Sequence, residues 1–326
     1  MPLFPVRTRT GIVQKGEGAV QTGTQLDFVV SHWLDIGTFT ISKTTGGTSG
    51  GSYLVTARDG TFVLRQLRSA TAAMQEYEIS RLLSDMGIAA AIHPTRQGSP
   101  FLQVRDSCFN LQSFLPGCAP DLSDRAAVAA AANSLAAMQQ RLETCGLTVL
   151  DSDRFHTMSL WERAKSQAPL FAPFFPPDCT VEAIEATIRH AENTMGREQI
   201  IHGDLGSWNM LWDQKRIHFI DFGECRLGDY SFDIAAIMAS ILRAAPDGPK
   251  QYENLDLFLR TYEEQFHPVD RARLQTAVWL WLLRGALAVC VFTTEPQRKE
   301  LLIRRFLCDL DKFRHWSALF SDKQQA

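Results

Sequence analysis

Residues 201–211 read IHGDLGSWNML, and residues 217–223 read IHFIDFG. The first stretch places Asn209 five positions after Asp204, and the second places Asp221 twelve positions after Asn209. Both stretches begin in short β-prone segments, and helix-forming sequence follows them. A single Gly-Asp or Asp-Phe-Gly is an ordinary turn. The two together, in this order and spacing, indicate polar loops that serve one site.

These stretches resemble the catalytic loop and the Asp-Phe-Gly motif of the protein-kinase-like fold. The resemblance is closest to its aminoglycoside phosphotransferase, choline kinase and homoserine kinase branch, and it covers the chain from about residue 39 to the C-terminus. The Asp-to-Asn spacing is that of the kinase pattern HRDxxxxN, and Gly203 replaces the Arg, as in the small-molecule branch. The resemblance implies an α+β, bilobal protein-kinase-like fold with an antiparallel β-sheet N-lobe and a mainly helical C-lobe.

The implied reaction is transfer of the γ-phosphoryl group of ATP to a hydroxyl of a small molecule. Such transfer needs positioned groups and charge neutralisation more than covalent help. Asp204 fits the base that takes the hydroxyl proton, and Asn209 and Asp221 offer the oxygen ligands that Mg²⁺ prefers. His202 is expected to hold the loop in shape. Asp233 is expected to accept hydrogen bonds from the loop, although an acid at a helix N-terminus explains it equally well.

Upstream, the resemblance implies a phosphate-covering loop and a cation on the third strand. The glycine run at 46–51 suits the loop, where Gly47, Thr48 and Ser49 offer backbone N–H groups. Arg65 takes the place of the usual Lys, and its guanidinium group can fork onto phosphate oxygens.

The resemblance also implies a glutamate that pairs with this cation and a strand that contacts the adenine. Glu76 and Glu78 compete for the first role, and we favour Glu76 because it shares a helical face with apolar residues. The adenine is expected to lie against the backbone of 112–115, with Gln112 and Phe114 as contacts. Whether ATP or GTP is preferred stays open.

The remaining pattern fits two lobes preceded by a flexible N-terminal extension of unassigned role. We expect the extension at 1–25, a nucleotide-binding N-lobe at 26–116 and a catalytic, acceptor-binding C-lobe at 117–326. Predicted strands lie at 39–43, 52–56, 61–67, 101–107 and 108–115, with an Asp59-Gly60 hairpin turn. Predicted helices lie at 70–86, 123–142 with Ser123 as N-cap, 181–195 with Thr180 as N-cap, and over most of the chain after 233. The proline-rich segment 168–178 is predicted to be a loop, either covering the acceptor or burying its phenylalanines.

Composition excludes several other classes of protein. The 326 residues carry a net charge of -3, which argues against a nucleic-acid partner. Seven scattered cysteines without a C-x-x-C pair fit reduced thiols, and the N-terminus shows no signal peptide, so a cytoplasmic protein is expected. The apolar stretch 277–292 has Arg284 at its middle and is predicted to be a buried helix, not a membrane span. A monomer or homodimer fits equally well.

The sequence leaves the acceptor open. Acids would suit an aminoglycoside and tryptophans would suit choline, and the C-terminal helices hold both, so neither residue type decides. An amino sugar or antibiotic-like acceptor is placed slightly ahead of homoserine or choline. A non-catalytic scaffold with a kinase fold is the alternative from another class. A protein kinase is disfavoured because no Ala-Pro-Glu segment follows Gly223.

Overall fold

A computed structural model describes residues 23–44, 51–149, 155–197, 199–244 and 249–325, and these form two compact units. Unit 1 holds the described residues of Met1–Ala119, Cys145–Leu150 and Asn209–Cys225, and unit 2 holds the others. The sequence expectation placed all of 117–326 in one lobe. Residues 209–225 belong to unit 1 because their backbone bonds there: the Phe219 N–H donates to Ile88 O over 2.7 Å, and the Trp212 N–H donates to Cys118 O over 2.8 Å.

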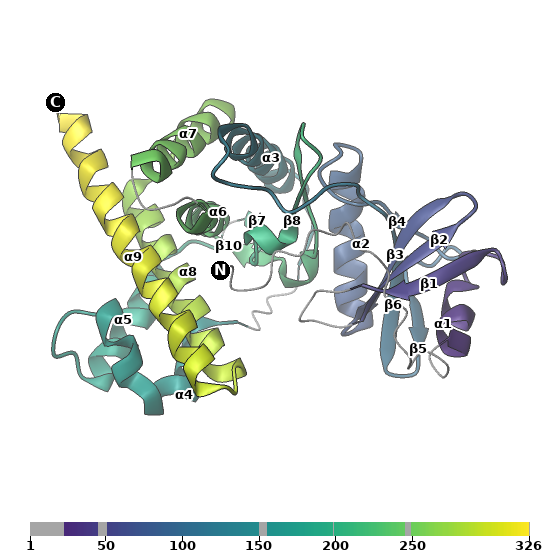
Figure 1. Ribbon diagram of the computed structural model, residues 1–326, viewed down its shortest axis with the longest axis horizontal. Helices are drawn as coiled ribbons and strands as arrows, with labels where there is room; N and C mark the ends of the chain where they lie inside the picture. Colours follow the sequence, from purple (N-terminus) through teal and green to yellow (C-terminus); the bar gives the residue numbers. More distant parts are fainter. Residues whose placement is uncertain (1–22, 45–50, 150–154, 198, 245–248, 326) are drawn as a thin grey trace. The chain divides into compact units, whose positions relative to one another are not determined.

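Unit 1 is built on an antiparallel sheet, as the sequence predicted (Figure 1). Its strand order is β1-β2-β3-β6-β4, and β5 also pairs with β6. The strands are β1 (Phe39–Lys43), β2 (Ser52–Ala57), β3 (Gly60–Leu67), β4 (Ile92–His93), β5 (Leu102–Val104) and β6 (Ser107–Ser113). The predicted turn joins β2 to β3, where Gly60 has a φ of +149° that disfavours any side chain. Strand β4, two residues long, was not predicted.

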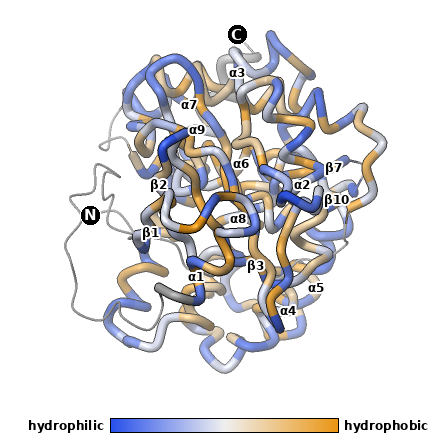
Figure 2. Tube along the Cα trace, turned by 90° about the vertical axis from the view of Figure 1, so that its right-hand side faces the viewer, coloured by the Kyte–Doolittle hydropathy of each residue, from blue (hydrophilic) through white to orange (hydrophobic). Residues whose placement is uncertain are grey.

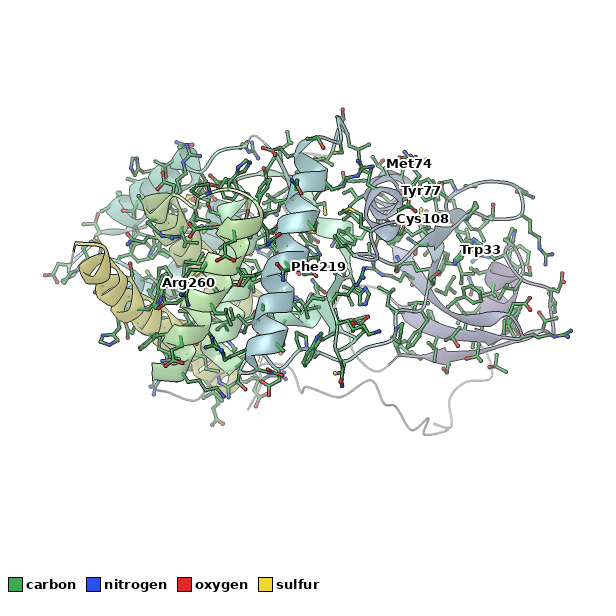
Figure 3. The ribbon with its side chains drawn as sticks, turned by 90° about the horizontal axis from the view of Figure 1, so that it is seen from above. Trp33, Met74, Tyr77, Cys108, Phe219 and Arg260 are labelled. Atoms are coloured by element: carbon green, nitrogen blue, oxygen red, sulfur yellow. The ribbon has the colours of Figure 1, made fainter. Side chains whose placement is uncertain are left out.

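Helix α1 (Gly23–Val30) lies against this sheet and begins inside the stretch expected to be a loose extension. Val29, Val30 and Trp33 pack with sheet residues Val55 and Leu64 in a buried cluster, which Figure 3 marks at Trp33. Burial of this apolar face stabilises a helix that is too short to form alone. Residues 1–22 lie outside the described residues.

Helix α2 (Ala70–Ser84) and a small hairpin complete unit 1. The Ser69 hydroxyl caps α2 by accepting the Ala72 N–H over 3.2 Å, and the helix ends two residues before the predicted end. Gly87, with a φ of +68°, reverses the chain beyond it. The hairpin pairs β8 (Met210–Trp212) with β9 (Ile217–Phe219).

Unit 2 is mainly helical, as predicted, with one short strand pair. Strand β7 (Gln199–Ile201) pairs antiparallel with β10 (Arg226–Gly228). The helices are α3 (Arg125–Glu143), α4 (Thr157–Ala164), η1 (Lys165–Phe174), α5 (Val181–Thr194), α6 (Ser231–Ala244), α7 (Pro249–Gln265), α8 (Arg271–Phe292) and α9 (Pro296–Gln325). Helix α7 buries one face, because Leu255, Phe258, Leu259 and Tyr262 recur at helical spacing and are buried. Figure 2 shows hydrophilic and hydrophobic residues mixed along the chain, as expected of helices that are partly buried.

Two local predictions in unit 2 need correction. The N-cap of α3 is Asp124, not Ser123, because the Asp124 carboxylate accepts the Ala126 N–H over 2.9 Å. The proline-rich segment is largely the 3₁₀ helix η1, and it buries Phe171 and Phe174. Of the two roles predicted for this segment, the buried rings support packing of its phenylalanines and not coverage of the acceptor.

Helix α8 is a core helix of unit 2. Among the described residues it alone is long and apolar enough to cross a membrane by length and composition, but most of that apolar stretch is buried inside the structure. It contacts α4, α5, α6 and α9. Its Arg284 is buried as well, and its guanidinium group donates to Gly203 O.

Candidate active site

In unit 2, helix α6 holds the loop that follows β7. Asp233, in the first turn of α6, accepts the His202 N–H over 2.8 Å and the Gly203 N–H over 2.9 Å. Gly203 has a φ of +75°, which lets both donors face one carboxylate. The Asp204 N–H in turn approaches His202 Nδ1 at 3.4 Å. His202 and Asp233 thus lie where the sequence expected supports of the loop.

Asp233 is fully buried, with no exposed surface. Burial raises the pKa of its carboxyl group, against the opposing effects of His202, the two backbone N–H donors and Arg226. A buried carboxyl group that accepts two backbone bonds ties the loop to α6 and is costly to lose.

Asp204 itself is only partly buried, and two side chains approach its carboxylate. Trp208 Nε1 donates to Asp204 Oδ2 over 3.4 Å. Arg284 Nη2 lies 4.0 Å from Oδ1, and Arg284 Nη1 donates to Gly203 O over 2.9 Å. Arg226 Nη1 also donates to Gly203 O, over 3.3 Å. The loop therefore presents a carboxylate oriented by an indole and flanked by guanidinium charge.

Unit 1 brings together the predicted cation and two acids. Arg65 on β3 pairs through Nη1 with Glu76 of α2 and through Nη2 with Asp221 Oδ1 at 2.6 Å. Glu78 instead pairs with Arg81 on the exposed side of α2, so Glu76 is the partner of Arg65.

Strand β6 supplies further contacts to Glu76. Gln112 Nε2 donates to Glu76 Oε1 over 3.3 Å, and Asn110 Nδ2 lies 3.5 Å from Glu76 Oε2. Burial alone would lower the pKa of Arg65, but attraction to Glu76 and Asp221 outweighs it and raises that pKa. Arg65 therefore stays charged while it lies buried between two carboxylates.

Asp221 and Asn209 lie on adjoining backbone in unit 1. The Ile220 N–H donates to Asn209 O over 3.0 Å. Asp221 adopts a left-handed conformation with a φ of +67° before the 3₁₀ turn η3 (Phe222–Glu224), and its side chain is one-third exposed. Such a backbone is unusual for a residue other than glycine and is found at functional sites.

The residues predicted to contact adenine and phosphate either lie outside the described residues or make contacts within unit 1. Gly47, Thr48 and Ser49 lie outside the described residues. Gln112 lies inside the sheet, and its side chain donates a hydrogen bond to Glu76. The Phe114 N–H donates to Thr61 O over 3.1 Å, so this backbone donor is already used within unit 1.

Sequence reasoning missed the partners that come from distant elements. Arg284 was interpreted only as a charge that argues against a membrane span, and Asn110 was not singled out. A signal for Arg284 existed, because a charge at the centre of an apolar helix must be paired when buried. Which group pairs with it could not be predicted, since Gly203 lies 81 positions away.

The chain belongs to the phosphotransferase enzyme family, whose sequence model matches residues 40–282. It is accordingly a small-molecule kinase with a protein-kinase-like fold. The chain is similar in structure to the amicoumacin kinase hAmiN solved with AMP-PNP, Ca²⁺ and Ami, with 17% identity over 90% of this chain and 93% of that one and a TM-score of 0.68.

Two further solved structures share the fold. An aminoglycoside phosphotransferase from Alicyclobacillus acidocaldarius is 13% identical, with a TM-score of 0.62 and coverage of 97% of this chain and 98% of that one. The choline kinase LicA from Streptococcus pneumoniae is 15% identical, with a TM-score of 0.59 and coverage of 89% and 99%. A comparison with curated protein sequences found no match.

Proposed function

We propose that this kinase uses ATP, with Asp204 as the base that deprotonates the acceptor hydroxyl and Arg65 as the cation that holds nucleotide phosphates. The observation that supports this best is Arg65 itself, buried with two acids from different elements. A buried ion cluster is weak evidence of stability, since apolar residues of similar volume often stabilise as well. A cluster at this position is better explained by a role in binding phosphate.

The residues fit a nucleotide-bound divalent cation. A carboxylate from Asp221 and an amide oxygen from Asn209 are hard ligands suited to Mg²⁺, which keeps waters and phosphate oxygens as its other ligands. When bound, the ion would neutralise charge on the phosphates. The described residues hold no cluster of three or more His, Cys, Asp or Glu that could bind a metal ion.

The chain's own residues then divide the work. Asp233 and His202 hold the loop, Asp204 orients and deprotonates the hydroxyl, and Glu76 keeps Arg65 in place. The proposal requires Asp204 and the nucleotide-holding residues to act on one substrate pair. We expect the enzyme to work in the cytoplasm on a small molecule, without nucleic acid or membrane.

The acceptor proposed from sequence is an amino sugar or antibiotic-like molecule, with homoserine or choline next. The similar structures include kinases named for amicoumacin, for aminoglycosides and for choline, so they support a small hydroxylated acceptor without choosing one. The scaffold alternative is disfavoured because Asp204, Asn209 and Asp221 are all present.

The test measures ADP formed from Mg-ATP with a panel of hydroxylated acceptors. Asp204→Ala should lower transfer by about a thousandfold, the size of general-base effects, while Mg-ATP still raises the melting temperature. EDTA should abolish transfer. Asp106→Ala removes an exposed carboxylate in unit 1 and is the matched control, which should transfer normally. Transfer that survives in Asp204→Ala would remove the base assignment.

A further inference from the structure

Trp208 stands out because a large apolar ring lies exposed next to the proposed base. Its side chain is on the same loop as Asp204, and 41% of the residue is exposed. Single exposed apolar residues are common on protein surfaces, so the exposure of Trp208 matters only because of where the ring lies and how it is held. The charge-handling roles assigned above do not use its ring.

The ring is held in place from two sides. Trp281 of α8 stacks on it with ring centroids 6.2 Å apart and planes 14° from parallel. Trp281 is itself buried and makes an edge-to-face contact with Phe232, with ring centroids 5.4 Å apart. Gly206 makes room for the ring, because a Cβ there would lie 2.3 Å from Trp208 Cη2. The indole is therefore preorganised and not a freely moving surface side chain.

The Trp208 ring also contacts the proposed base. Its Nε1 donates to Asp204 Oδ2, so the exposed indole and the reacting carboxylate keep a fixed relation. The exposed indole therefore lies beside the carboxylate that an acceptor hydroxyl would have to reach. A flat face of C–H or π groups packs well on such a ring, and such contacts favour binding.

Charge near the loop narrows the class of acceptor. Arg284 lies 4.0 Å from Asp204 Oδ1 and 5.2 Å from the centroid of Trp281, and Arg226 reaches Gly203 O. These guanidinium groups offset the negative charges of Asp204 and Asp233. Because the charges beside Asp204 are balanced, a cationic acceptor gains little extra attraction there.

We propose that Trp208 selects the acceptor, and that the acceptor carries an uncharged flat face, an aromatic ring or the C–H face of a sugar, beside the hydroxyl that is phosphorylated. The inference rests on the proposed function, because it takes Asp204 as the base. It replaces the amino-sugar expectation with a neutral acceptor.

The test compares neutral and cationic acceptors by ADP release. The probes are phenyl β-glucoside and benzyl alcohol as neutral flat molecules, and choline and kanamycin as cationic ones. We expect the wild-type enzyme to show a higher kcat/KM for a neutral probe. The same probe should quench the tryptophan fluorescence of the wild-type enzyme. The quenching should be smaller in Trp208→Phe, because this variant lacks only the Trp208 indole.

The variants separate the two tasks of Trp208. Trp208→Leu should raise the KM for the neutral acceptor about tenfold, because the stacking face is lost. Trp208→Phe keeps a ring and loses the N–H, so kcat should fall about threefold with little change in KM. Gly206→Ala should raise the acceptor KM as Trp208→Leu does, because the added Cβ displaces the ring. The KM for ATP should stay unchanged in all three.

Trp316→Phe is the matched control. It removes another indole N–H that donates to a carboxylate, that of Asp256 at 2.8 Å, and should leave both KM values unchanged. An unchanged acceptor KM in Trp208→Leu, or a preference for the cationic probes, overturns the inference while Asp204-dependent transfer keeps the proposed function. Neutral probes that are neither phosphorylated nor able to quench Trp208 also overturn it. Transfer that is independent of Asp204 instead contradicts the proposed function.

Discussion

At the scale of single residues, the positive charge of Arg65 compensates the buried carboxylate of Glu76. Glu76 is almost fully buried, so removing its guanidinium partner leaves an uncompensated carboxylate in the interior. Arg65→Met should lower the free energy of unfolding by about 3 kcal/mol at neutral pH, measured by urea denaturation. The loss should be larger than any change caused by the shape of the new side chain, because Met fills much of the same volume.

The pH dependence of this variant has a definite sign. Burial raises the pKa of Glu76 above its usual 4.5, and Arg65 opposes that shift, so the pKa rises further in Arg65→Met. The folded variant then binds a proton that the unfolded chain releases, and its stability increases as pH falls from 8 toward 5. The deficit relative to the wild type should shrink over that range. Arg81→Met, in the exposed pair with Glu78, should change nothing at either pH, and a deficit of Arg65→Met that is equal at pH 8 and 5 contradicts the argument.

At the scale of elements, α6 positions the loop of Asp204 through a single side chain. In Asp233→Asn the amide nitrogen faces a backbone N–H, so one of the bonds from His202 and Gly203 is lost. We expect the free energy of unfolding to fall by about 2 kcal/mol. Transfer should fall at least tenfold, since about 1.4 kcal/mol of lost positioning has that effect, while stabilisation by Mg-ATP persists. Urea melts and ADP release measure the two effects.

The control for this variant is an acid at another helix start. Asp270 caps α8 by accepting the N–H groups of Ala272 and Arg273. Asp270→Ala should cost about 1 kcal/mol, the usual value of an N-cap, without changing transfer. Equal loss of transfer in both variants would show that activity follows stability alone, and that α6 has no special role.

At the scale of the whole molecule, the thiols report how the chain is folded. Cys108, Cys225 and Cys290 are buried, Cys145 and Cys179 are partly exposed, and Cys118 and Cys308 are exposed. Burial raises the pKa of Cys108 and Cys290, which lowers their thiolate fraction. Ellman's reagent should therefore modify Cys118 and Cys308 quickly, Cys145 and Cys179 more slowly, and the three buried thiols only after unfolding. Fewer than seven reactive thiols in denatured, unreduced protein would indicate a disulfide and contradict the reducing environment expected from sequence.

Local sequence was sufficient where the deciding interactions span a few residues. The strands, the Asp59-Gly60 turn and the predicted helices of unit 2 agree with the structure because alternation of apolar residues, turn chemistry and capping act within one element. Small errors arose where two neighbours could do the same job. Both Ser123 and Asp124 can cap α3, and the choice depends on backbone geometry that the letters do not carry.

By itself the sequence determined the order and spacing of Asp204, Asn209 and Asp221 and, through them, the class of fold and reaction, because these groups are close in the chain and their chemistry demands their types. Only the tertiary structure decided that Glu76 and not Glu78 meets Arg65, and that a buried Arg284 reaches the loop of Asp204. Such pairings join residues that are far apart in the chain or on opposite faces of one helix. They depend on how whole elements pack, which no local pattern encodes.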